Sequence, residues 1–163
     1  MEPISYCRAI EADMQALIDS RIAFLIELCG QPTTEELNSL IDGLEEYFVR
    51  ALRNNTYLGY FAKVGNIVVG TGGMTVREHP GSFRNPSGIV GYIMNMYTQP
   101  EYRNRGIGSK IIRHLSQLAI EMNIPVLELH ATKAGEPVYI KCGFEKHSEP
   151  TYRNFLTKQA STI

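Results

Sequence analysis

The residues best suited to chemistry lie in a glycine- and arginine-rich turn at positions 103–109. The turn reads Arg-Asn-Arg-Gly-Ile-Gly-Ser and separates a strand-like run at 89–97 from a helix-like run at 106–122. Glycines at such a junction let the chain fold tightly, so that successive backbone N–H groups point at one anion. The first N–H groups of a helix lack partners, and the helix dipole adds partial positive charge there. Phosphate is therefore the expected ligand, with Arg103 and Arg105 as countercharge.

Two familiar phosphate-binding patterns do not describe this turn. The pattern G-x-x-x-x-G-K-[ST] does not occur in the chain, and the dinucleotide fingerprint requires a glycine where Ile111 stands. Taken alone, the turn also fits a plain helix start with solvated arginines. A nucleotide-binding α/β domain that uses the turn for another phosphate remains one hypothesis.

A second informative segment lies at positions 129–144. It reads Leu-His-Ala-Thr and then, from position 137, Pro-Val-Tyr-Ile-Lys-Cys-Gly-Phe. The chain resembles the GNAT acetyltransferase superfamily at both segments. Residues 103–108 match its hallmark [QR]-x-x-G-x-[GA], and residues 137–144 are similar to its "LYEKxGF" segment. Two blocks in the right order are more specific than either alone, and the resemblance is firm from Tyr92 to Phe144.

This resemblance implies that acetyl-CoA is the co-substrate. Backbone N–H groups of the turn would hold the pyrophosphate, and the pantetheine arm would lie where the strand ending at residues 96–98 diverges from the next strand. A backbone N–H near Met96 or Tyr97 would polarise the thioester carbonyl. The residues expected to bind acetyl-CoA are Met96, Tyr97, Thr98, Arg103, Asn104, Arg105, Gly106, Ile107, Gly108, Ser109 and Thr132.

The resemblance also implies a catalytic role for Tyr139, which matches the tyrosine that commonly protonates the departing CoA sulfur. A tyrosine packed in the core is the competing interpretation. The acceptor side is expected at Met94 and Asn95, where polyamine-acetylating relatives often carry a Glu-Asp pair, so a polycationic acceptor is not favoured. The general base is left open between a water chain and residues elsewhere, with Glu128 and His130 as candidates.

The pattern of apolar residues predicts the elements that position these groups. Helical spacing at 14–28 and 37–52 predicts two helices, with Asp13 as a cap for the first and a Thr33–Glu36 capping box for the second. Strands are expected at 4–9, 57–64, 67–76, 89–97 and 126–130, and a short helix at 134–141. Residues 144–147 and 152–157 are expected to form a closing antiparallel pair.

This order predicts a mixed α/β fold. The resemblance implies a GNAT-type fold, with a central, mostly antiparallel twisted sheet, flanking helices and two parallel central strands that splay apart. The whole chain, 1–163, is expected to form one domain.

Composition narrows the class of protein further. Sixteen Lys plus Arg against 17 Asp plus Glu argue against a nucleic-acid partner. The odd count of 3 cysteines indicates a reducing compartment, and no apolar run approaches the roughly 20 residues that span a membrane. We expect a cytoplasmic protein without a membrane partner. The 4 histidines do not cluster in sequence, so no metal site is expected. Relatives often form homodimers, which remains possible here.

The sequence thus predicts an N-acetyltransferase that moves an acetyl group from acetyl-CoA to a primary amine of a small molecule or peptide, by direct attack in a ternary complex. The alternative on the same fold is a non-catalytic acyl-CoA binding or sensing domain, which the absence of carboxylates at positions 94 and 95 motivates.

Overall fold

The computed structural model describes residues 2–154, which form a five-stranded sheet in the order β1-β2-β3-β4-β5. The strands are β1 (Ile4–Arg8), β2 (Tyr57–Val64), β3 (Ile67–Glu78), β4 (Ile89–Thr98) and β5 (Val126–Leu129). The first four pair antiparallel, and β4 pairs parallel with β5. A parallel pair needs a crossover connection, and the helix after β4 supplies it. The predicted mixed α/β fold is confirmed.

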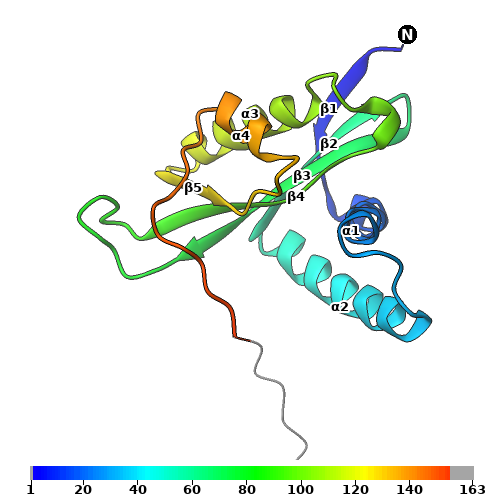
Figure 1. The fold of residues 1–163 in the computed structure, drawn as a ribbon, viewed down its shortest axis with the longest axis horizontal. Coiled ribbons are helices and arrows are strands. Elements are labelled where there is room, and N and C mark those ends of the chain that lie inside the picture. The colour runs from blue at the N-terminus through cyan, green and yellow to red at the C-terminus, as the bar shows by residue number, and fades with distance from the viewer. Residues whose placement is uncertain (1, 155–163) are drawn as a thin grey trace, which may run out of the picture.

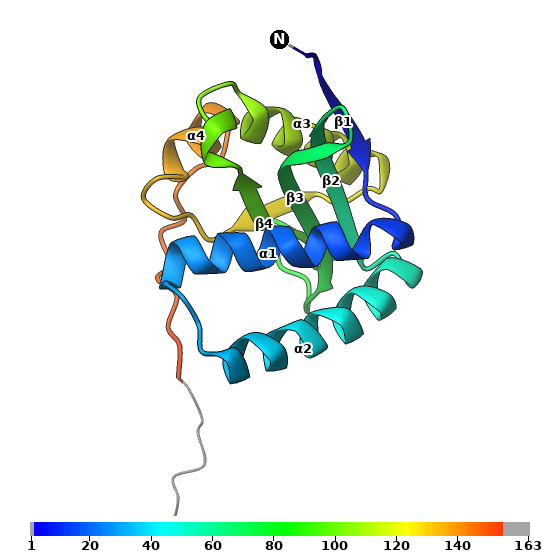
Figure 2. The ribbon, with the colours of Figure 1, turned by 90° about the vertical axis from the view of Figure 1, so that its right-hand side faces the viewer.

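Helices cover both faces of this sheet (Figures 1 and 2). One face carries α1 (Met14–Cys29) and α2 (Thr34–Arg53), and the other carries α3 (Ile107–Glu121) with the short α4 (Glu136–Lys141) beside it. Two 3-10 turns, η1 (Glu11–Asp13) and η2 (Pro100–Tyr102), complete the elements. None of the helices in residues 2–154 combines the length and the apolar composition needed to cross a membrane.

Each face of the sheet has its own apolar core. Beneath α3, buried side chains such as Met74, Ile93 and Ile111 pack together. Beneath α1 and α2, the core includes Leu17, Ile18, Phe48, Tyr57 and Phe61. The side of the sheet covered by α3 is called the α3 face below, and the side covered by α1 and α2 is called the α1/α2 face.

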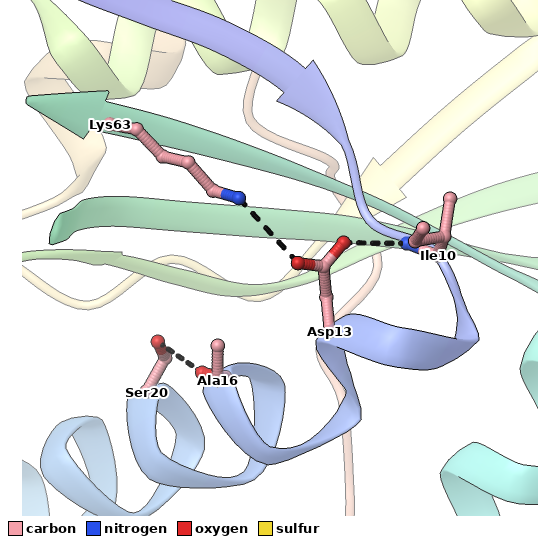
Figure 3. A network of polar contacts seen from close by, with 5 residues as sticks. All are labelled: Ile10, Asp13, Ala16, Ser20 and Lys63. Atoms are coloured by element: carbon pink, nitrogen blue, oxygen red, sulfur yellow. Dashed lines mark hydrogen bonds and ion pairs between the residues drawn. The ribbon is translucent and has the colours of Figure 1, made fainter. Parts of the chain in front are cut away.

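The two N-terminal helix starts differ from one another. The predicted capping box is confirmed for α2, because Glu36 N–H donates to Thr33 Oγ1 at 3.2 Å and Thr33 N–H donates to Glu36 Oε2 at 2.8 Å. Asp13 does stand at the N-cap position of α1, as predicted, but its side chain makes no capping hydrogen bond to that helix. Its carboxylate accepts from the N–H of Ile10 at 3.1 Å and lies 3.5 Å from Lys63 Nζ (Figure 3). The intervening turn η1 draws the carboxylate back toward its own start, away from the N–H groups of α1.

The end of the described chain also differs from the sequence-based expectation. Residues 144–154 contain no strand, so the predicted closing pair is absent there, and residues 155–157 lie outside the described part. Pro150 cannot donate to a ladder, and the N–H of Glu149 bonds instead to His147 Nδ1 at 3.1 Å. Such local side-chain bonds compete with strand pairing.

The strand β4 carries the two irregularities that create room for a site. Its pairing with β5 stops at Ile93–Leu129, so the β4 edge from 94 to 98 has no strand partner on that side within residues 2–154. Its pairing with β3 shifts register between Thr71 and Gly73, opposite Asn95, whose φ of 56° is left-handed. A bulge of this kind turns consecutive side chains to the same face. The predicted splay of the parallel strands is confirmed.

Candidate functional site

A cleft of about 620 Å³ opens where β4 and β5 diverge. Its walls come from the end of β4, the turn before α3, the loop after β5, the helix α4 and the last turns of α1. Most residues that the sequence singled out for acetyl-CoA meet there, namely Met96, Tyr97, Thr98, Arg103, Asn104, Gly106, Ile107, Gly108, Ser109 and Thr132. The tertiary structure thus joins segments that lie far apart in the sequence.

The turn before α3 has the backbone shape of an anion-binding nest. Asn104 and Gly106 both have left-handed backbones, with φ of 60° and 74°. The helix begins at Ile107, and the first amide bonded back into the turn is that of Lys110, which donates to the carbonyl of Gly106 at 3.0 Å. The preceding N–H groups of Ile107, Gly108 and Ser109 are therefore available to a ligand. A Cβ on Gly106 would meet nothing within 4 Å, so the turn leaves open space beside this backbone.

Arginines flank this nest in different ways. Arg103 lies on the cleft wall, where its guanidinium donates to Glu27 Oε2 and to the Thr98 carbonyl at 3.0 Å. The hydrogen bond to Glu27 raises the pKa of the Arg103 guanidinium, so this cation stays charged. Arg105 is outside the cleft lining; it donates to the Glu101 carbonyl at 3.2 Å and lies over the ring of Tyr102. Arg105 thus supports the turn from behind.

The bulge in β4 separates the two sides of the site. Met94 packs into the core of the α1/α2 face, and Asn95 also points there, because its Nδ2 donates to Tyr57 Oη at 3.3 Å. Met96 packs into the core of the α3 face and lines the cleft. The predicted acceptor residues, Met94 and Asn95, therefore lie on the opposite face from Met96, the first of the predicted acetyl-CoA residues on β4.

Tyr139 stands on α4 at the cleft wall, with its ring edge-on to Phe144 at a centroid distance of 6.1 Å. Burial raises the pKa of its phenol above the ordinary 10.0, so the hydroxyl keeps its proton over a wide pH range. A protonated phenol can donate a hydrogen bond or a proton to an atom in the cleft. The helix that carries Tyr139 begins after Thr132, whose Oγ1 accepts from the N–H of Gly135 at 3.1 Å.

A tyrosine–histidine pair marks the point where β4 and β5 part. Tyr92 Oη lies 2.6 Å from His130 Nδ1, and His130 Nε2 lies 3.2 Å from Thr151 Oγ1. Tyr92 alternates with Ile93 along β4 and so points to the α1/α2 face, where the guanidinium of Arg77 lies 3.8 Å from its ring centroid. Neither Tyr92 nor His130 belongs to the lining of the cleft, whose β4 wall begins at Met96.

Several residues of the site were not found by sequence reasoning. The cleft is also lined by Glu27 from α1 and by Ala134, Gly135, Pro137, Val138 and Lys141 around α4. The contact of Glu27 with Arg103 spans 76 positions and has no local sequence signal. The α4 residues carry a partial signal, because they immediately precede or surround Tyr139 in the segment that resembles the family.

Comparison with known proteins agrees with this geometry. Residues 22–144 match the Acetyltransferase (GNAT) family, and the chain belongs to that family. It is similar to a predicted acetyltransferase from Clostridium acetobutylicum, whose crystal structure contains acetyl-CoA, with 32% identity, a TM-score of 0.85 and coverage of 93% of this chain and 96% of that one. Family membership makes this chain an acyltransferase of the acyl-CoA-dependent kind.

Two further solved structures share the fold at lower identity. A GCN5-related N-acetyltransferase from Ralstonia eutropha is 24% identical, with a TM-score of 0.82 and coverage of 93% of this chain and 99% of that one. Glucosamine-6-phosphate N-acetyltransferase from Arabidopsis thaliana is 16% identical, with a TM-score of 0.65 and coverage of 94% and 99%. No protein of curated function matches this chain in sequence.

Proposed function

We propose that this protein transfers an acetyl group from acetyl-CoA to a primary amine by direct attack within a ternary complex. The observation that carries the proposal is the cleft that joins the anion-binding nest, the open edge of β4 and the phenol of Tyr139. The residues fit acetyl-CoA at each point. The nest and Arg103 suit the pyrophosphate, the free edge of β4 suits the amides of the pantetheine arm, and the splay suits the thioester.

Tyr139 acts in this proposal as the acid for the departing sulfur. The amine nitrogen forms a bond to the thioester carbonyl carbon, the carbon–sulfur bond breaks, and the sulfur takes the phenolic proton. Water then restores that proton to Tyr139. Burial of Tyr139 supports this role, because a phenol with a raised pKa remains the proton-bearing form at physiological and moderately alkaline pH.

The geometry favours His130 over Glu128 as the base. Both side chains are exposed, but His130 is bonded to Tyr92 at the point where the strands part, whereas Glu128 makes no ion pair within residues 2–154. The Tyr92 oxygen would take the proton of the attacking amine while its own proton passes to His130 Nδ1. This assignment removes the need for a carboxylate at Met94 or Asn95.

The decisive experiment measures CoA binding and thiol release on the same preparations. Wild-type protein should bind CoA by calorimetry and release thiol from acetyl-CoA in the presence of a primary amine. Tyr139→Phe should lower kcat by about 100- to 10,000-fold with little change in CoA affinity, since it removes an acid and leaves the nest intact. Phe144→Leu, which alters only the ring packed beside Tyr139, is the matched control and should retain most turnover.

A pH profile tests the acid, and two further variants test the base. Turnover of the wild type should not decline on the alkaline side until the pH exceeds the ordinary phenol value of 10.0, because burial raises the pKa of Tyr139. His130→Gln and Tyr92→Phe should each lower kcat, because each removes one member of the proton-accepting pair. CoA binding without thiol release across a broad panel of amines would instead support the acyl-CoA binding or sensing alternative.

A further inference from the structure

Arg21 interrupts the apolar stripe with which α1 packs on the sheet. It follows Leu17 and Ile18 by four and three positions and precedes Phe24 by three, so it shares their side of the helix. Leu17 and Ile18 are 2% and 0% exposed, which shows that this side faces the sheet. Arg21 is itself half-buried. A cation in such a place loses hydration and needs a compensating anion.

The described residues offer Arg21 aromatic neighbours but no anion. Its guanidinium lies 5.5 Å from the centroid of the Phe24 ring, and electrostatic interactions with Tyr57, Cys29 and Tyr92 oppose the lowering of its pKa by burial. None of the ion pairs formed within residues 2–154 includes it. Burial lowers the pKa of Arg21, in keeping with a cation that is desolvated without a carboxylate beside it.

The nearest acidic side chains on α1 are engaged elsewhere. Asp19 accepts from Gln15 Nε2 at 2.8 Å, and Glu27 binds Arg103. On the sheet, Glu128 shares the α1/α2 face but is exposed and forms no ion pair with Arg21. The positive charge of Arg21 therefore remains uncompensated on this face.

Arg21 lies on the sheet-facing side of α1 beside Phe24, and other groups of the site point to the same α1/α2 face. Phe24 lines the acetyl-CoA cleft, and Tyr92 holds His130 at the point where the strands part. Tyr57 bonds to Asn95, whose Oδ1 is buried without a hydrogen-bond partner in the described chain. An amine that reaches the thioester from the α1/α2 face would thus meet the cation of Arg21.

We propose that Arg21 binds an anionic group on the acceptor, so that the acceptor is a small amine that also bears a carboxylate or a phosphate. This inference rests on the proposed acetyl transfer and adds the class of acceptor to it. The anion would occupy the place of the missing counterion at Arg21, while the amine is directed to Tyr92. A guanidinium suits either anion, because its donors match two oxygens at once.

The test uses pairs of amines that differ only in the anionic group. Glycine is compared with glycinamide, other amino acids with their amides, and 2-aminoethyl phosphate with ethanolamine. Wild-type kcat/KM should favour the anionic member of the preferred pair by about 10- to 100-fold. Arg21→Met should abolish this preference mainly through KM, and Arg21→Lys should restore part of it. Arg113→Met removes the same charge from the exposed side of α3 and should leave the preference unchanged.

A binding measurement makes the inference independent of turnover. CoA-saturated protein is titrated with N-acetylated amino acids and their neutral amides by calorimetry. If the wild type binds the anionic compounds and Arg21→Met does not, the inference is supported, even when the wild type acetylates no amine. A wild type that acetylates no amine would refute the proposed function. Equal binding or equal turnover of the neutral and anionic compounds would overturn the inference and leave acetyl transfer intact. The absence of any binding in this titration would also overturn the inference.

Discussion

The two faces of the sheet contribute different kinds of groups to the site, main-chain groups on one face and side chains on the other. On the α3 face, the cleft is made largely of main chain: the nest around Gly106, the open edge of β4 and the start of α3. On the α1/α2 face, the groups that matter are side chains from separate elements, with Arg21 on α1, Tyr57 on β2, Tyr92 and Asn95 on β4, and His130 after β5.

This difference explains what each face can recognise. Backbone N–H groups bind any ligand with the right phosphate geometry, so the α3 face suits a donor that stays the same across a family. Side chains brought together by folding vary freely with sequence, so in the proposed function the α1/α2 face would select the acceptor. The two faces meet at the bulge in β4, where the side chain of Asn95 points to the α1/α2 face and that of Met96 points to the α3 face.

The strongest test of this separation is Gly73→Ala on β3. A Cβ there would overlap the hydroxyl end of Tyr57, which is 1% exposed and packs edge-on against Phe48 at 5.1 Å. Displacing a packed ring should cost about 1–3 kcal/mol of unfolding free energy, measured by denaturant titration. Turnover should fall because Tyr57 also holds Asn95, while CoA affinity should stay near that of the wild type. A parallel loss of CoA affinity would show that the faces do not act separately.

On the opposite face, Gly106→Ala should damage the donor site. Alanine at a φ of 74° costs about 1–2 kcal/mol, and the altered nest should weaken CoA binding by about tenfold or more. Gly43→Ala is the matched control, since its Cβ meets nothing within 4 Å in the middle of α2. That change should stabilise the protein by about 0.5–1 kcal/mol without affecting CoA. Unchanged CoA affinity in Gly106→Ala would contradict the role of the nest.

The smallest expected effect comes from Glu27→Gln, at the border between the faces. The Arg103–Glu27 pair is partly exposed, so its loss should change the unfolding free energy by less than about 1 kcal/mol. Because Glu27 competes with phosphate for Arg103, CoA binding should tighten by about two- to fivefold at low salt, and the gain should shrink at high salt. Weaker CoA binding in this variant would mean that Glu27 orients Arg103 rather than restrains it.

Sequence reasoning succeeded where the signal is local. The helix after the turn, the hairpin of β2 and β3, and the Thr33–Glu36 capping box follow from periodicity and from residues a few positions apart. It failed for the side-chain cap from Asp13 and for residues 144–154, where one turn of 3-10 helix and one proline changed the outcome. In both cases a short-range hydrogen bond competed with the predicted element, and single-residue propensities do not resolve such competition.

The sequence by itself determined the class of protein, because the donor site depends on glycines and on main-chain direction, which a short contiguous stretch encodes. Only the tertiary structure decided which side chains stand around the acceptor. Arg21 and Tyr92 lie 71 positions apart in the chain, and nothing in their local sequence predicts that both face the same side of β4. Their meeting follows from the packing of α1 on the sheet and from the register of β4 with β5, both of which are set by burial of the whole core.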